Sequence, residues 1–139
     1  MTSAAHTFYT AKAHTTGGRE GGASRTDDGR LEVKIAPPGS AAPGTNPEQL
    51  FAAGWSTCFL SAVKIAAAKR KIQLPDGLAV DAEVDLMTDR GEFFLKARLD
   101  VHLPGIEPEV GRALVQAAHE ICPYSKATRG NIDVALAVV

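Results

Sequence analysis

The chain has 139 residues, of which 45% are apolar and 22% charged, and its formal net charge at pH 7 is −1. This length predicts a single domain spanning residues 1–139, with enough apolar side chains for one hydrophobic core. The near-neutral charge and the small number of aromatic residues argue against nucleic acid or an anionic membrane surface as a partner.

The N-terminal residues 1–13 contain polar residues throughout and lack the basic and then apolar layout of a signal peptide. We therefore expect a cytoplasmic protein, in which the two cysteines, Cys58 and Cys122, are reduced. Polar and charged residues, among them Thr57 and Lys64, interrupt the longest apolar region. A membrane-spanning segment is therefore not expected.

The N-terminal part of the chain predicts two strands separated by glycine-rich turns. Residues 8–16 are rich in threonine and aromatic side chains, which favours a strand. Paired glycines then flank Arg19, and such a segment tolerates unusual backbone angles. Apolar and charged residues alternate over residues 30–35 after the turn dipeptide Asp28-Gly29, which predicts a half-buried strand. Residues 36–45 form a loop rich in proline and glycine.

A long helix is expected over residues 46–72. Asn46 is a favourable N-cap, Pro47 suits the first helical position, and Glu48 suits the positive end of the helix dipole. The helix is apolar on nearly every side, which places it in the centre of the structure. Gly54 predicts either a kink or the close approach of another segment. Cys58 lies in the middle of this helix.

Two strands with regular alternation follow and predict an antiparallel hairpin with one solvated face. A turn at Arg90-Gly91 would set two pairs of opposite charge across the strands, Glu83 with Arg98 and Asp85 with Lys96. The side chains expected to point inward are Leu78, Val80, Ala82, Val84 and Leu86 in the first strand and Phe93, Leu95, Ala97, Leu99, Val101 and Leu103 in the second.

A second helix is expected from Pro108 to Cys122, where the following proline ends it. Its apolar stripe consists of Val110, Leu114, Ala117 and Ile121. Alternation over residues 132–138 predicts a last strand. The order of strands, long helix, hairpin, helix and strand predicts an α+β fold.

No pattern in the chain indicates a metal or a bound cofactor. The histidines share no ligand spacing with each other or with the cysteines, and no glycine motif is suited to holding phosphate groups. A cysteine hydrolase would need a histidine base beside Cys58. His119 is the nearest candidate, but it falls about half a turn from the apolar stripe of its helix and is predicted to face solvent.

The two cysteines are the remaining candidates for chemistry. A thiolate is stabilised by a helix N-terminus or a nearby cation, so a break at Gly54 would favour a reactive Cys58. Arg19 could supply the cation, with Glu48 holding it in place. Glu48 lies about 15 Å from Cys58 along a straight helix, so it reaches the thiol only through a kink or from a second subunit. Alternatively Cys58 is inert, because free cysteine is among the most often buried residue types.

Two segments resemble a known family. The sequences NPEQLFAAGWSTCF (residues 46–59) and ICPYSKATRGNIDV (residues 121–134) strongly resemble the organic hydroperoxide resistance proteins. These are a branch of the superfamily named for the osmotically inducible protein C. The likeness covers nearly the whole chain, including the loop around Arg19. Residues 55–57 depart from the family pattern, which often has tyrosine and small residues there.

The resemblance implies a thiol peroxidase that works without metal or haem in the response to oxidative stress. Cys58 corresponds to the peroxidatic cysteine, whose thiolate attacks the hydroperoxide and becomes a sulfenic acid. Cys122 corresponds to the resolving cysteine, which then forms an intramolecular disulfide with Cys58. Arg19 and Glu48 correspond to the pair that activates the thiolate. Family members are reduced by dihydrolipoyl groups, often on lipoylated proteins.

The resemblance also implies an OsmC-like fold, in which antiparallel sheets wrap long central helices in an intertwined homodimer with active sites at the interface. An apolar pocket would favour alkyl or fatty-acid hydroperoxides over hydrogen peroxide, by ~0.8 kcal/mol per buried methylene. The aromatic candidates for its lining are Phe51, Trp55, Phe59, Phe93 and Phe94, each of which is otherwise ordinary core packing. The alternative to an enzyme is a hydrophobic-ligand-binding stress protein with inert cysteines.

Overall fold

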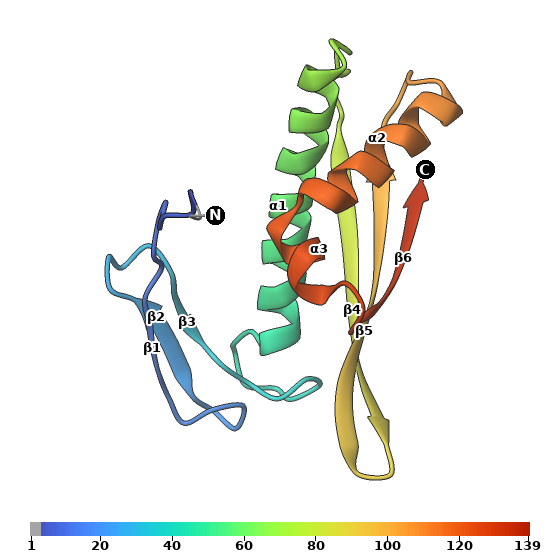
Figure 1. Ribbon diagram of the computed structural model, residues 1–139. Helices are drawn as coiled ribbons and strands as arrows, with labels where there is room; N and C mark the ends of the chain where they lie inside the picture. Colours follow the sequence, from blue (N-terminus) through green and yellow to red (C-terminus); the bar gives the residue numbers. More distant parts are fainter. Residues whose placement is uncertain (1–3) are drawn as a thin grey trace. The chain divides into compact units, whose positions relative to one another are not determined.

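The computed structural model describes residues 4–139, so the start of the polar N-terminal segment lies outside the described residues. The chain divides into two compact units, Met1–Pro47 (unit 1) and Glu48–Val139 (unit 2). The elements follow the expected α+β order of strands, long helix, hairpin, helices and a last strand (Figure 1). A single domain spanning residues 1–139 stays a prediction.

Unit 1 contains an antiparallel sheet of order β1-β2-β3, formed by β1 (Ala13–Thr16), β2 (Ala23–Thr26) and β3 (Glu32–Lys34). The turn expected at Asp28-Gly29 joins β2 to β3, with Gly29 at a φ of 72°. The sequence does not predict β2, because its residues Ala-Ser-Arg-Thr show no alternation of apolar and polar side chains. Pairing with its two neighbours makes this segment a strand.

Unit 2 is built around α1 (Pro47–Lys69), which runs without interruption through Gly54. The alternative of a break at Gly54 is therefore wrong, and the alternative that another segment approaches Gly54 closely is confirmed. A Cβ atom at this position would lie 2.9 Å from Cζ of Tyr124, so only glycine leaves room for that ring. By length and composition α1 could cross a membrane. Core helices meet the same criteria, and α1 buries six residues: Trp55, Phe59, Ala62, Val63, Ala66 and Ala67.

The sheet of unit 2 has the order β4-β5-β6, formed by β4 (Ala79–Asp89), β5 (Glu92–His102) and β6 (Asp133–Val138). β4 and β5 form the expected antiparallel hairpin, and β6 lies parallel to β5. The predicted register is confirmed, with Glu83 opposite Arg98 and Asp85 opposite Lys96. Arg98 nevertheless binds both carboxylates, at 2.9 Å from Glu83 and 2.8 Å from Asp85, and its hydrogen bonds lower the pKa of Asp85.

Two helices connect β5 to β6, namely α2 (Pro108–Ile121) and α3 (Pro123–Thr128). α3 is not predicted from the sequence. Together with α1 and the sheet, α2 encloses a core that includes Trp55, Phe59, Val63, Leu99, Val101 and Val115. The inward orientation expected for Leu86 and Phe93 is wrong, since both are exposed in the single chain. The part of the β4–β5 hairpin to which they belong extends beyond the N-terminal end of α1 (Figure 1).

Candidate active site

The fold of unit 2 brings Cys58 and Cys122 together. Cys58 lies on α1 and is partly exposed, whereas Cys122 lies between α2 and α3 and is fully buried. Cys58 packs against the buried cluster that contains Cys122, the two thiols are close enough for Cys122 to raise the pKa of Cys58, and both thiols are free. A peroxide arriving from solvent therefore meets Cys58 before Cys122.

The sequence around Cys122 explains why this residue joins two helices. Pro123 disfavours helical angles in the residue before it, and Cys122 adopts an extended conformation with φ −62° and ψ 123°. The Cys122 N–H donates to the carbonyl of Ala118 at 2.8 Å, in the last turn of α2. The Cys122 carbonyl accepts from the N–H of Lys126 at 2.9 Å, in the first turn of α3. Cys122 is thus held by the backbone of both helices.

Three influences act on the acidity of Cys58. Burial raises the pKa of its thiol above the ordinary value of 9.0, and the hydrogen bond with Cys122 raises it further. The backbone N–H of Tyr124 acts in the opposite direction and lowers the pKa. This N–H belongs to the first turn of α3, where backbone donors have no partner within the helix. The helix start near Cys58 is therefore that of α3, and not one produced by a break at Gly54.

The side of α1 that carries Cys58 also carries Phe51, Gly54 and Trp55, at the spacing of one helical face. This face contacts α3 at several points. The indole Nε1 of Trp55 donates to Oγ of the buried Ser125 at 3.4 Å. The rings of Phe51 and Tyr124 meet edge to face, with centroids 5.9 Å apart. Tyr124 and Ser125 are not predicted from the sequence as site residues. Pro123 could have indicated them, because proline is typical of the first position of a helix and α3 begins there.

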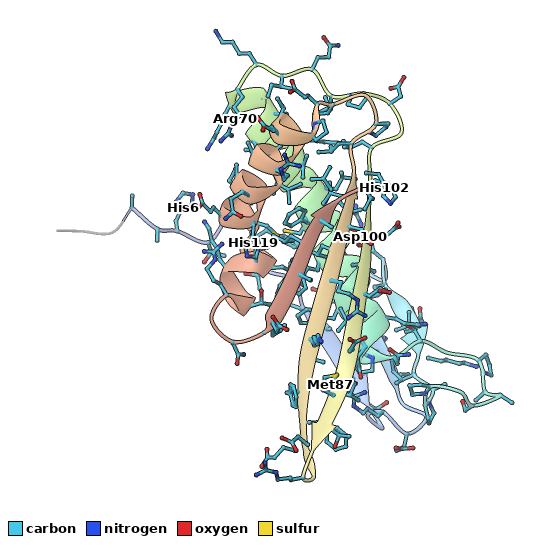
Figure 2. All side chains as sticks on the ribbon, turned by 90° about the vertical axis from the view of Figure 1, so that its right-hand side faces the viewer. His6, Arg70, Met87, Asp100, His102 and His119 are labelled. Atoms are coloured by element: carbon cyan, nitrogen blue, oxygen red, sulfur yellow. The ribbon has the colours of Figure 1, made fainter. Side chains whose placement is uncertain are left out.

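An apolar pocket of about 490 Å³ lies beside this face, lined by Phe51, Pro123, Tyr124, Ala127, Thr128, Asn131 and Ile132. Of the five aromatic candidates, Phe51 lines this pocket. Trp55 and Phe59 are fully buried in the core. Phe93 and Phe94 are 69% and 50% exposed and belong to the part of the hairpin where Met87 is labelled (Figure 2). In the single chain these four residues do not line this pocket.

The two remaining candidates lie in different units. Arg19 is exposed in the turn between β1 and β2, where Gly17, Gly18 and Gly21 have positive φ angles of 74°, 64° and 84°. Glu48 lies in the first turn of α1. Because α1 continues through Gly54, the expected route by which a kink brings Glu48 to Cys58 is removed. The other predicted way for Glu48 to reach a Cys58 thiol, from a second subunit, stays a prediction.

His119 differs from its expected solvent-facing position. It lies on α2 (Figure 2) and is partly buried, and this burial lowers its pKa. Its Nδ1 atom is buried without a hydrogen-bond partner, so this nitrogen accepts no proton from Cys58. Within residues 4–139, no three His, Cys, Asp or Glu side chains are grouped so that they could hold a metal ion.

Comparison with known proteins places the chain in a family. The family described as OsmC-like proteins matches residues 37–137. An organic hydroperoxide resistance protein from Xanthomonas axonopodis pv. citri is 44% identical over 98% of both chains. The crystal structure of the organic hydroperoxide resistance protein OhrB of Bacillus subtilis superimposes with a TM-score of 0.90 at 42% identity, covering 96% of this chain and 100% of OhrB.

A further crystal structure, of an organic hydroperoxide resistance protein from Legionella pneumophila, has a TM-score of 0.88 at 43% identity and covers 96% of this chain and 98% of its own. The near-complete coverage includes both cysteine segments and the fold that brings them together. The chain therefore belongs to the organic hydroperoxide resistance proteins of the OsmC-like family.

Proposed function

We propose that this protein reduces organic hydroperoxides to alcohols and so contributes to the response to oxidative stress. The observation that carries the proposal is the contact between the thiols of Cys58 and Cys122 in one chain. Two free thiols that lie close together in one chain can form a disulfide after a local movement. The names of the relatives support the same substrate class.

The proposed reaction has two oxidative steps. In the first, the Cys58 thiolate attacks the outer oxygen of ROOH; an S–O bond forms, the O–O bond breaks, and the alkoxide takes a proton to leave as ROH. Cys58 becomes a sulfenic acid and has lost two electrons. In the second step, the Cys122 sulfur attacks the sulfenic sulfur, the S–S bond forms and water leaves. The difference in exposure supports these roles, because the fully buried Cys122 is the less accessible to peroxide.

A dithiol must then return two electrons and two protons to the disulfide. We propose a dihydrolipoyl group, free or on a lipoylated protein, as this reductant, with no cofactor resident in the protein. We also propose a cytoplasmic location, where such reductants are present.

Activation of the thiolate requires a cation, because burial and Cys122 together raise the pKa of Cys58. We propose Arg19 for this role, with Glu48 orienting its guanidinium. The uninterrupted α1 separates Glu48 from the Cys58 of its own chain by about 15 Å. Glu48 is therefore proposed to act in an intertwined homodimer, at the Cys58 of the partner chain.

The apolar pocket at Phe51 is the proposed binding place for the chain of the hydroperoxide. Each methylene buried there contributes about 0.8 kcal/mol, which hydrogen peroxide cannot gain. Phe93 and Phe94, exposed in the single chain, would serve this purpose only through the second subunit. The same pocket is the feature that favours the second candidate function, a hydrophobic-ligand-binding stress protein.

Disulfide mapping separates the two functions. The reduced full-length protein is treated with one equivalent of cumene hydroperoxide, remaining thiols are alkylated, and peptides are identified by mass spectrometry. We expect a Cys58–Cys122 link within one chain, and none in a sample alkylated before oxidation. Two unmodified cysteines after exposure would contradict the peroxidase and favour the binding protein.

Replacing Arg19 by methionine should shift the reactivity of Cys58 to higher pH. The thiolate is the reactive form of Cys58. Without a stabilising cation, burial keeps the pKa of this thiol above 9.0, so less thiolate is present at neutral pH. Each unit of increase lowers alkylation of Cys58 at neutral pH about tenfold. The pH profile of iodoacetamide alkylation measures this. Arg30→Met, which removes another exposed arginine of unit 1, is the matched control. Identical pH profiles for Arg19→Met and the wild type would exclude Arg19 as the cation that activates Cys58.

A further inference from the structure

Gly54 of α1 is in close contact with Tyr124 of α3. The ring of Tyr124 lies against its Cα, and a Cβ atom at residue 54 would stand 2.9 Å from Cζ of Tyr124 and closer still to its hydroxyl oxygen. Both atoms lie at the outer end of the rigid phenol group of Tyr124, so a methyl group here must displace that ring. The ring also packs edge to face on Phe51, which stabilises the observed position.

Tyr124 and Cys122 belong to one small rigid segment. Pro123 stands between them, and the carbonyl of Cys122 accepts the Lys126 N–H at 2.9 Å. A displacement of the start of α3 is therefore transmitted to Cys122. The segment rests on α1 through Tyr124 on Gly54 and through the hydrogen bond between Trp55 and Ser125.

We propose that Gly54 and Tyr124 are a positioning pair that sets the approach of Cys122 to Cys58, and that their packing affects the rate of disulfide formation more strongly than the attack on peroxide. The inference rests on the proposed function. The attack on peroxide needs the activated Cys58 thiolate and the bound hydroperoxide, but not the Cys122 sulfur. The second step needs the Cys122 sulfur to reach the sulfenic sulfur so that the S–S bond forms and water leaves.

The chain contains a reporter for this movement. Trp55 is its single tryptophan, is fully buried, and bonds to Ser125 of α3. Its fluorescence should respond when α3 shifts on α1. The two steps can thus be followed separately: peroxide consumption reports the attack, and Trp55 fluorescence together with thiol quenching and mass spectrometry reports the disulfide.

The test is a double-mutant cycle of Gly54→Ala, Tyr124→Ala and the combination, in the full-length protein with one equivalent of cumene hydroperoxide. Gly54→Ala should slow disulfide formation about tenfold or more, since misplacement by 1 Å can cost about 10²-fold. Peroxide consumption should slow by a smaller factor: Tyr124 lines the apolar pocket and its N–H lowers the pKa of Cys58, but the attack does not depend on the position of the Cys122 sulfur. Without the Tyr124 ring the added methyl meets no obstacle, so Gly54→Ala should have no further effect in the Tyr124→Ala background.

Gly111→Ala is the matched control. It makes the same exchange within α2, where the new Cβ meets only side-chain atoms of Val138 and Leu103, at 3.3 and 3.5 Å. It should leave both steps unchanged.

Three results would overturn the proposal: disulfide formation in Gly54→Ala as fast as in the wild type, an equal loss from Gly54→Ala in both backgrounds, or equal slowing of both steps. If Gly54→Ala does not fold, Tyr124→Ala alone decides, because loss of this contact should slow the second step and an unchanged rate contradicts the pair. A wild-type protein that forms no disulfide at all refutes the proposed function itself, and the inference with it.

Discussion

Replacing Cys58 by serine should abolish the turnover of bulky organic hydroperoxides. A serine hydroxyl is not ionised near neutral pH and cannot be oxidised to the equivalent of a sulfenic acid. The loss should exceed about 10³-fold, as expected for removal of an essential nucleophile. Cys122 cannot take over, because it is fully buried and has no access to the peroxide.

The measurement is consumption of cumene hydroperoxide with dihydrolipoamide as reductant, at equal concentrations of folded wild-type and variant protein. Ser61→Ala is a suitable control, since it changes an exposed small residue of the same helix. Circular dichroism checks that Cys58→Ser is folded. Undiminished turnover in Cys58→Ser would refute the proposed chemistry, whatever the state of Cys122.

Replacing Cys122 should have an equally large effect on turnover but a different effect on the first step. With no resolving thiol, Cys58 should react once with hydroperoxide and remain a sulfenic acid. The expected result is consumption of one equivalent per site, followed by arrest, with further oxidation to the sulfinic acid when peroxide is in excess. No disulfide should form.

The choice of replacement matters, because Cys122 is fully buried. A serine there buries a hydroxyl, which costs about 1–3 kcal/mol if it is left without a partner. Alanine avoids this cost and leaves only a small cavity. Both variants should give the same single oxidation, observed as a one-oxygen mass increase or by a sulfenic-acid probe. Sustained turnover in either variant would show that Cys122 is not the resolving thiol.

Together the two variants separate the roles that the difference in exposure suggests. A partly exposed nucleophile next to a buried thiol gives the peroxide access to one sulfur only. In the proposed mechanism the buried thiol is adjacent when Cys58 is oxidised, so we expect it to consume the sulfenic acid before a second peroxide arrives. Such an arrangement would protect Cys58 from irreversible oxidation.

Much of the fold could be predicted from local patterns. The N-terminal signals at residues 46–48 placed the start of α1 correctly, and the dipeptides at Asp28-Gly29 and Arg90-Gly91 placed two hairpin turns. The register of β4 and β5 followed from the turn at Arg90-Gly91, and the alternation assigned the side chains of each strand to the two faces of the hairpin. These features depend on neighbours within a few residues.

Local patterns failed where distant segments decide the structure. Alternation assigned Phe93 and Leu86 to the core, but no helix among residues 4–139 covers this part of the hairpin, and both side chains are exposed. Asp85 lies opposite Lys96 as expected, but the guanidinium of Arg98 donates two hydrogen bonds to its carboxylate. Arg98 has the geometry for such a bidentate contact, which a lysine ammonium lacks.

The sequence by itself determined which atoms do the proposed chemistry, since Cys58 and Cys122 are the only cysteines and lie in two specific motifs. Only the tertiary structure decided how they meet. It showed that α1 is unbroken, that Gly54 makes room for Tyr124, and that the start of α3 supplies the N–H near the Cys58 sulfur. Periodicity and capping are local properties of the chain, whereas these contacts join residues far apart in sequence and arise only when α3 packs on α1.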